Sequence, residues 1–237
     1  LGVYSEIVQP TAQLSELSDY SGLIFSGGPS SVYADNAPSF NKDILNFDRP
    51  ILGICYGHQV ICHTLGGEVK PGRVKEYGVA KINIKENSGL FDGLDSSETV
   101  WMSHGDQVTE LPPGFSALAF TDNSPMAVLG DDKKRLGIQF HPEVVHTAEG
   151  KTIIQNFLYE ICGCQQLWTS GNFVADTIAS IRDQVGDGKV ICALSGGVDS
   201  AVAATLVHRA VGDQLTCIFV DNGLMRREEP ERVRATF

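Results

Sequence analysis

The 237-residue sequence has no apolar run that approaches the roughly 20 residues of a membrane-spanning helix. It also has no basic start followed by an apolar core, so no secretory signal is visible. We therefore expect a cytoplasmic protein without a membrane partner.

Basic residues are scarce as well. The sequence carries 18 lysines and arginines against 29 aspartates and glutamates, which gives a formal net charge of −11 at pH 7. Because nucleic-acid backbones are bound by basic patches, this balance argues against a broad nucleic-acid surface, and we expect no nucleic-acid partner. It is still compatible with a local phosphate site built from backbone N–H groups.

The six cysteines show no zinc-binding spacing. Cys162 and Cys164 form the only close pair, and no second pair or suitably spaced histidines accompany them. Apolar residues make up 42% and charged residues 20% of the chain, as in a globular protein with an ordinary buried core. Such a chain does not need disulfide staples, so we expect reduced thiols.

Short apolar runs rich in β-branched residues predict an α/β fold with a mixed sheet and flanking helices in the first two thirds of the chain. Residues 21–30 indicate a strand and a glycine loop, and residues 49–67 indicate a strand, a sharp turn and a helix. Three runs within 79–129 are typical of antiparallel strands. Residues 134–144 predict a further strand, and residues 149–163 predict a helix.

The pattern restarts near residue 167, where we place a domain boundary between segments 1–166 and 167–237. An amphipathic helix that ends near Gly186 is predicted first. Its apolar face consists of Ile178, Ile181 and Val185. Residues 189–223 then predict a strand, a loop, a helix and a second, parallel strand. This is thin for a complete parallel-sheet domain, so we expect the second domain to be partial.

The stretch GICYGHQ, residues 53–59, places Cys55 at a strand-to-helix turn between Gly53 and Gly57. A helix N-terminus aimed at a cysteine favours the thiolate, which is the reactive form. Small flanking residues let a nucleophile occupy such a turn. The alternative is that Cys55 is a small core residue, and the turn alone leaves both interpretations open.

The stretch QFHPEV supplies a base and an orienting group. His141 can move a proton and Glu143 can hold its ring, with the intervening proline fixing the backbone. The glycine loop SGGPS, residues 26–30, can present one oxyanion donor, and the backbone N–H of Tyr56 can present a second. Together these features favour a nucleophilic cysteine.

The motifs SGGP, GICYGHQ and HPEV, in this order and spacing, resemble the class I (triad) glutamine amidotransferases over residues 1–166. The resemblance implies that Cys55 attacks the side-chain amide of glutamine, that His141 is the general base and then the acid, and that Glu143 orients His141. It implies Gly28 and Tyr56 as the oxyanion donors. It also implies a set of glutamine-binding residues, namely Gln59, Ser103, His104 and Asp106.

A second loop, ALSGGVDSAV at residues 193–202, follows a predicted strand and opens a helix. Its glycines can fold the backbone into a nest of N–H groups for an anion, although a serine-capped turn is the simpler alternative. The loop resembles the pyrophosphate-binding PP-loop of N-type ATP pyrophosphatases. The resemblance implies ATP-binding residues, namely Ser195, Gly196, Gly197, Val198, Asp199 and Ser200. It further implies Mg²⁺ bound with ATP near Asp199, and nucleotide contacts within 219–226.

An amidotransferase followed by a PP-loop domain resembles the family of glutamine-hydrolysing GMP synthases. The resemblance implies that glutamine supplies ammonia to xanthosine 5′-monophosphate that ATP has adenylated, yielding GMP, AMP, pyrophosphate and glutamate. Relative to that family the chain lacks a first strand and helix, and it ends before a C-terminal domain through which we expect a homodimer. We therefore expect a fragment that makes no GMP by itself. The alternatives are another amidotransferase/PP-loop fusion with a different acceptor, or a non-catalytic module of the same fold.

Overall fold

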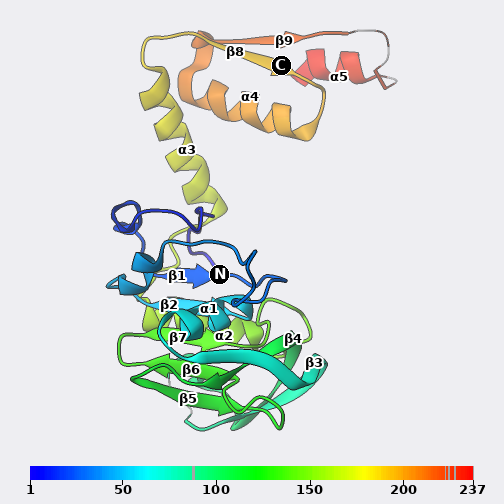
Figure 1. Ribbon diagram of the computed structural model, residues 1–237. Coiled ribbons are helices and arrows are strands. Elements are labelled where there is room, and N and C mark those ends of the chain that lie inside the picture. Colours follow the sequence, from blue (N-terminus) through cyan, green and yellow to red (C-terminus); the bar gives the residue numbers. More distant parts are fainter. Residues whose placement is uncertain (87–88, 222, 224, 227, 237) are drawn as a thin grey trace. The chain divides into compact units, whose positions relative to one another are not determined.

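The computed structural model describes residues 1–86, 89–221, 223, 225–226 and 228–236. The chain divides into two compact units (Figure 1). The first comprises Leu1 and Val3–Gln165, and the second comprises Gly2 and Gln166–Phe237.

The first unit contains a seven-stranded sheet. Its strands are β1 (Leu23–Phe25), β2 (Ile51–Ile54), β3 (Glu68–Ile84), β4 (Ser97–Glu110), β5 (Phe115–Phe120), β6 (Val128–Asp131) and β7 (Arg135–Ile138). Its α-helices are α1 (Tyr56–Thr64) and α2 (Gly150–Asn156). Short 3-10 helices cover Leu14–Leu17, Lys42–Asn46 and Gly89–Phe91, and a π-helical turn, Phe157–Ile161, continues α2.

The strand order is β1-β2-β7-β6-β5-β3-β4. Strands β1, β2 and β7 are parallel, and the pairs from β7 through β6, β5 and β3 to β4 are antiparallel. This confirms the mixed sheet predicted from the sequence. Cys55 follows β2 and His141 follows β7, so the two residues leave neighbouring parallel strands at the same edge of the sheet.

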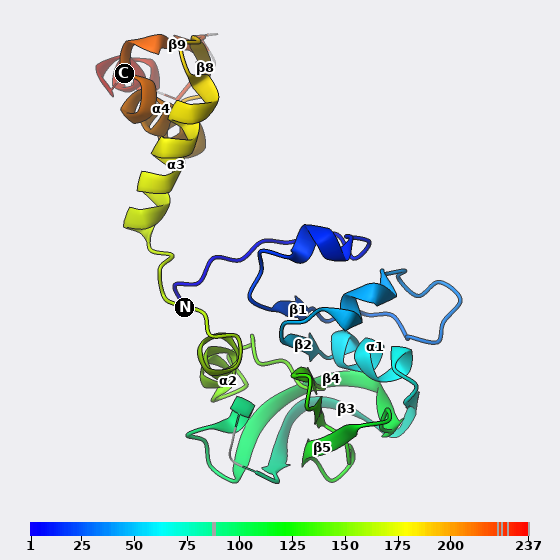
Figure 2. The same cartoon turned by 90° about the vertical axis from the view of Figure 1, so that its left-hand side faces the viewer.

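The parallel part of the sheet is covered on both faces, because successive residues of β2 point to opposite sides. Leu52 packs in one cluster with Ile153 of α2, and Ile51 packs in a second cluster with Ile61 of α1. The two helices therefore lie on opposite faces of the sheet (Figure 2). Two-sided burial explains why these strands are continuous apolar runs rather than alternating ones.

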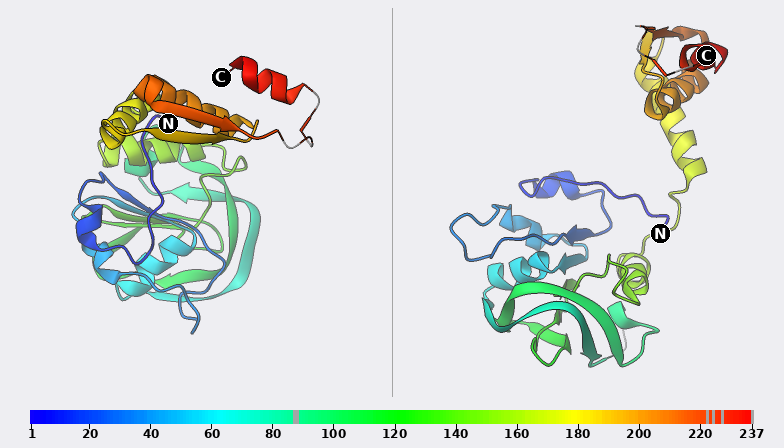
Figure 3. Two further views of the ribbon diagram at one scale, coloured as in Figure 1. Left: turned by 90° about the horizontal axis from the view of Figure 1, so that it is seen from above. Right: turned by 90° about the vertical axis from the view of Figure 1, so that its right-hand side faces the viewer.

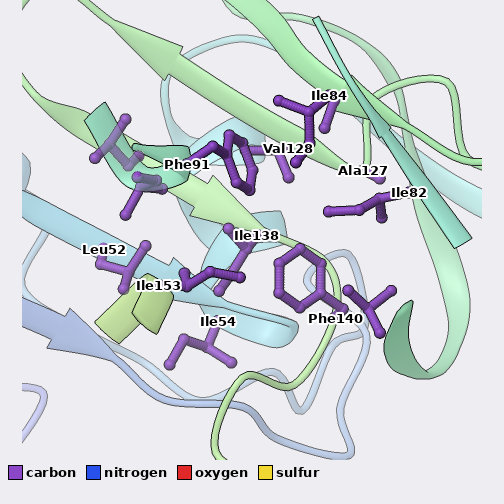
Figure 4. Close-up of a cluster of buried hydrophobic side chains, with 14 of the residues drawn as sticks. Leu52, Ile54, Ile82, Ile84, Phe91, Ala127, Val128, Ile138, Phe140 and Ile153 are labelled. Atoms are coloured by element: carbon purple, nitrogen blue, oxygen red, sulfur yellow. The ribbon is translucent and has the colours of Figure 1, made fainter. Parts of the chain in front are cut away.

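The first of these clusters extends to the residues that precede Cys55 and His141. Ile54, Ile138 and Phe140 lie in it together (Figure 4). Phe140 and Ile138 are completely buried. Anchoring these side chains fixes the backbone from which Cys55 and His141 project.

The long curved hairpin of β3 and β4 extends further than the sequence indicated (Figure 3). The whole stretch SHGD, residues 103–106, lies inside β4. The pairing shifts register between Pro71 and Glu76, and beyond the shift Glu76 lies opposite His104. A proline, which has no N–H to donate, falls at this irregularity, so pattern alone did not show the strand continuing.

The second unit has the predicted order of helix, strand, helix and strand, followed by one further helix that was not predicted. It contains α3 (Ser170–Val185), β8 (Val190–Leu194), α4 (Val198–Val211), β9 (Leu215–Phe219) and α5 (Glu229–Thr236). Strands β8 and β9 are parallel, and Leu194 forms a small core with Ala204 and Val233. Helix α3 ends at Gly186, whose φ of 51° suits a glycine. No helix within the described residues is long and apolar enough to cross a membrane.

Candidate active site

Cys55 occupies a strained turn between β2 and α1. It is one of the few non-glycine residues at positive φ, with φ 51° and ψ −101°. A Cβ at position 53 would lie 2.5 Å from the Gly57 carbonyl carbon. Both flanking glycines are thus required by close backbone approach, and the turn presents Cys55 directly at the start of a helix.

His141 and Glu143 form a pair beside this turn. The Nδ1 of His141 lies 2.7 Å from Oε1 of Glu143. A hydrogen bond with Cys55 is the main cause that raises the pKa of His141 to about 9; Glu143 raises it further, and burial opposes both. The arrangement of Cys55, His141 and Glu143 favours a protonated imidazole in the same site as a cysteine sulfur, as a cysteine nucleophile requires.

The backbone of His141 is held by Thr147 and Trp101. The N–H of His141 donates to the Trp101 carbonyl oxygen at 3.0 Å, and the N–H of Trp101 donates to Thr147 Oγ1 at 3.0 Å. The Thr147 hydroxyl in turn donates to the His141 carbonyl oxygen at 2.5 Å. This closed ring of hydrogen bonds attaches the histidine to β4. Sequence reasoning missed Thr147, since a lone hydroxyl six residues after His141 carries no signal of its own.

The glycine loop after β1 reaches the same place. A Cβ at Gly27 would lie 3.2 Å from Cε1 of His141 and 3.7 Å from Cβ of Cys55. A Cβ at Gly28 would lie 3.6 Å from the ring of Tyr56. The structure therefore brings together the three motifs that the sequence singled out, from residues 27–28, 55–56 and 141–143.

Gln59 is buried next to this site. Its Nε2 donates to the Asp106 carbonyl oxygen at 2.9 Å and to Oε1 of Gln139 at 3.1 Å. The Nε2 of Gln139 donates in turn to Cys55 Sγ at 3.7 Å. Gln139 is completely buried, and it was not among the site residues expected from the sequence. Its position in QFHPEV, two residues before His141, is the only signal that could have indicated it.

The SHGD stretch contributes both to the site and to the core. The Ser103 carbonyl oxygen accepts from the Cys55 thiol at 3.7 Å. The Asp106 carboxylate accepts hydrogen bonds from Ser31 and, at 2.7 Å, from Tyr33, which ties β4 to the segment after the glycine loop. The ring of His104, in contrast, is turned into the core: Nδ1 lies 2.9 Å from the Asp106 carbonyl oxygen.

The other ring nitrogen of His104 lies 3.1 Å from Oε2 of Glu76, a buried carboxylate. Ser124 Oγ donates to the same oxygen at 2.7 Å. Thr121 Oγ1, at 2.9 Å, and Asn123 Nδ2, at 3.4 Å, donate to Oε1. Four donors satisfy this carboxylate, as burial of a charged group requires.

Three further ionisable groups of the first unit are poorly suited to proton transfer or nucleophilic attack. Burial is the main cause that lowers the pKa of His58 to about 3, which keeps its ring neutral. Burial raises the pKa of Cys62 to about 12 and is the main cause of a similar value for Cys162. All six cysteines are free thiols, as expected from the sequence.

The second unit holds the predicted PP-loop between β8 and α4. Gly196 has a φ of 84°, and Gly197 caps α4. Ser200 Oγ accepts from the Ser195 N–H at 3.2 Å, and Ser195 Oγ accepts from the Gly197 N–H at 3.3 Å. The two hydroxyl oxygens thus stabilise the loop by accepting hydrogen bonds from two of its own backbone N–H groups.

Asp199 lies exposed in the first turn of α4, beside the loop and Val198. Within the part of the chain that the structure describes, no three histidine, cysteine, aspartate or glutamate side chains gather as a metal site would require. Of the expected nucleotide-binding stretch 219–226, residues 222 and 224 lie outside the described residues. Phe219 ends β9 in the sheet that carries the loop.

Comparison with known proteins points in the same direction. The family model of class-I glutamine amidotransferases matches residues 1–161, and that of the tRNA methyl transferase HUP domain matches residues 188–235. A GMP synthase (glutamine-hydrolyzing) of Clostridium perfringens is 49% identical over 239 residues, covering 100% of this chain and 47% of that protein. That of Symbiobacterium thermophilum is 53% identical over 239 residues, covering 99% and 47%. The chain thus spans about half the length of the curated relatives it matches.

Among solved structures, the crystal structure of a putative GMP synthase subunit protein from Thermoplasma acidophilum is similar, with a TM-score of 0.57 and 32% identity. The match covers 67% of this chain and 80% of that one.

Proposed function

This chain belongs to the class-I glutamine amidotransferase family, and we propose that its first unit hydrolyses glutamine to supply ammonia for a GMP synthase. The observation that carries the proposal is that Cys55, at a strained strand-to-helix turn, and His141, paired with Glu143, lie next to the same glycine loop. Identity of about half the residues to curated GMP synthases supports the choice of acceptor.

In the proposed reaction the Cys55 sulfur attacks the side-chain amide carbon of glutamine, and the carbonyl π electrons move to oxygen. The backbone N–H groups of Gly28 and Tyr56 stabilise that oxyanion. His141 then donates its proton to the departing nitrogen, which leaves as ammonia, and a γ-glutamyl thioester remains. Water, deprotonated by His141, cleaves the thioester to glutamate and restores the thiol.

The remaining proposed roles follow from the contacts. Glu143 holds the tautomer and the orientation of His141. Ser103 contacts Cys55 directly, Gln59 is linked to it through Gln139, and Asp106 contacts Gln59. We assign Gln59, Ser103 and Asp106 to glutamine binding. The ring of His104 is engaged in the core, so any contribution of this residue to glutamine binding comes from its main chain.

We further propose that segment 167–237 begins an ATP pyrophosphatase domain whose loop, Ser195–Ser200, binds the phosphates of ATP. The 2-oxygen of xanthosine 5′-monophosphate attacks the α-phosphate, and pyrophosphate leaves. Ammonia from segment 1–166 then displaces AMP to form GMP. Activation is needed because the oxygen is otherwise a poor leaving group. Homodimer formation through a C-terminal domain of the whole protein is part of the same proposal.

Mg²⁺ fits the loop only as part of Mg-ATP. A carboxylate and phosphate oxygens are the ligands that Mg²⁺ prefers, and the ion is commonly held by one or two carboxylates together with the phosphates of a substrate. Asp199 supplies one exposed carboxylate beside the loop. The ion would neutralise phosphate charge there, next to the hydroxyls of Ser195 and Ser200.

The test is glutamate release and GMP formation by the full-length protein with xanthosine 5′-monophosphate and Mg-ATP. We expect Cys55→Ala to lose glutaminase activity but to form GMP when ammonium salt is supplied. Unchanged glutamate release would refute the role of Cys55. Glutaminase activity without any GMP, even with ammonia, would instead favour a fusion enzyme with another acceptor, and the absence of both activities would favour a non-catalytic module.

A further inference from the structure

Gln139 is a buried polar side chain that contacts the proposed nucleophile and has no role in the mechanism above. It is completely buried, and its Nε2 lies 3.7 Å from Cys55 Sγ, within the range of an N–H donor to sulfur. Burying a primary amide is costly unless its groups are hydrogen-bonded. The hydrogen-bond partners of the Gln139 amide therefore indicate its role.

The direction of the amide of Gln139 follows from its neighbours. One end of the Gln59 amide lies 2.9 Å from the Asp106 carbonyl oxygen, which can only accept, so that end is the NH₂ group. The same NH₂ group lies 3.1 Å from Gln139, so Gln139 presents its oxygen there. The NH₂ group of Gln139 is then the end that faces Cys55 Sγ.

These contacts run as a series from the Asp106 carbonyl oxygen through Gln59 and Gln139 to Cys55, and the Asp106 carbonyl oxygen has a further neighbour. The Asp106 carbonyl oxygen also lies 2.9 Å from His104 Nδ1. The other nitrogen of that ring contacts the Glu76 carboxylate. An amide flip at Gln139 would place nitrogen against nitrogen at Gln59, so the contact with Gln59 allows one orientation.

We propose that Gln139 stabilises the thiolate of Cys55 by donating an N–H to its sulfur, and that Gln59 acts as a positioning residue that orients this donor. A hydrogen bond to the charged form of an acid lowers its pKa. The Ser103 carbonyl oxygen, 3.7 Å away, accepts from the thiol and so favours the protonated form. The N–H of Gln139 favours the thiolate instead, and it does so without a contribution from His141.

The other ionisable groups around Cys55 act separately from this donor. His141 and Glu143 form the proton-transfer pair, and His58 is kept neutral by burial. Burial raises the pKa of Tyr56, which keeps its phenol neutral. The Asp106 carboxylate is engaged by two hydroxyls on a different part of the residue from the carbonyl oxygen in the series.

The proposal rests on the proposed role of Cys55, and the test separates the two. The rate of alkylation of Cys55 by iodoacetamide is measured against pH in the whole protein, with the labelled peptide quantified by mass spectrometry. A nucleophilic Cys55 gives an inflection below the value of about 8.5 of an ordinary thiol. If the wild-type inflection lies at or above that value, Cys55 is not the nucleophile, and both the proposed function and the present proposal are refuted.

Gln139→Glu keeps the shape and removes the donor, and Gln139→Met removes the donor without adding charge. Both are expected to move the inflection to higher pH and to slow alkylation at pH 6.5 by about tenfold. Gln59→Met, which frees the Gln139 amide to rotate, is expected to move the inflection in the same direction by less. The matched control is Gln155→Glu on α2, which should leave the inflection unchanged.

An unchanged inflection in Gln139→Met would overturn the proposal, even if Gln139→Glu shifts, because the effect would then come from the added charge. A role in packing alone would lower the melting temperature without moving the inflection. If Gln139→Met fails to fold, Gln59→Met, which adds no charge, decides: an unchanged inflection there overturns the proposal. Circular dichroism verifies folding of each variant.

Discussion

Gly57 lies so close to Phe25 that a Cβ atom at position 57 would be 2.2 Å from the Phe25 carbonyl oxygen. The first turn of α1 therefore presses directly on β1, with no side chain between them. This contact lets Cys55 sit at the edge of the sheet while the glycine loop that follows Phe25 comes within reach of it.

Gly57→Ala is expected to destabilise the first unit by about 1–3 kcal/mol, because overpacking must push β1 and α1 apart. It should also reduce glutaminase activity sharply, since the glycine loop moves away from Cys55. Urea unfolding and glutamate release measure the two effects. Gly171→Ala is the matched control, because a Cβ there meets nothing closer than 3.9 Å. Equal effects of both substitutions would contradict the role of the close contact.

Thr147→Val is expected to lower glutaminase activity with little change in the KM for glutamine. Loss of the hydroxyl leaves the Trp101 N–H and the His141 carbonyl oxygen without their partner, so the imidazole loses its fixed position. Thr147→Ser retains the hydroxyl and should keep most of the activity. If steady-state kinetics show equal losses in the two variants, the ring of hydrogen bonds does not position His141.

The pKa of His141 is raised above its ordinary value of 6.5 to about 9, chiefly by the hydrogen bond with Cys55 and less by Glu143. Its protonation therefore contributes stability that is fully present below about pH 6.5 and is lost as the pH rises through 9. We expect Cys55→Ala to lower the pKa of His141 more than Glu143→Gln does. NMR titration of the ring, assigned with His141→Gln, measures both shifts, and the reverse order would contradict the assigned cause.

Glu76→Gln is expected to destabilise the first unit by about 1–3 kcal/mol, because an amide cannot accept from all four donors that meet the carboxylate. At this chain length that loss corresponds to a fall in melting temperature of about 2–4 °C per kcal/mol. Thermal unfolding gives the value, with Glu160→Gln on the exposed surface as control. A melting temperature as high as that of the control would show that the carboxylate is dispensable.

The three motifs that the sequence singled out, the glycine loop, Cys55 and the pair His141–Glu143, each follow an apolar strand. Cys55 follows ILGI and His141 follows GIQF, and such runs are recognisable because both faces of a parallel strand are buried. The glycines around Cys55 are equally visible, since close backbone approach tolerates no side chain.

Gln139, Thr147 and Glu76 could not be recognised in this way. Each is a polar residue whose role depends on a partner far along the chain: Gln59 is 80 positions from Gln139, and Glu76 meets His104 only because the pairing of β3 and β4 shifts register. Local patterns do not encode such a shift.

The sequence by itself thus determined the order of elements, the sharp turn at Cys55 and the pair His141–Glu143, because local backbone sterics and hydrophobic burial act between near neighbours. Only the tertiary structure decided which buried amides and carboxylates surround them. Hydrogen bonds between distant segments depend on how strands pair and which side chains are excluded from water, and these are properties of the folded chain.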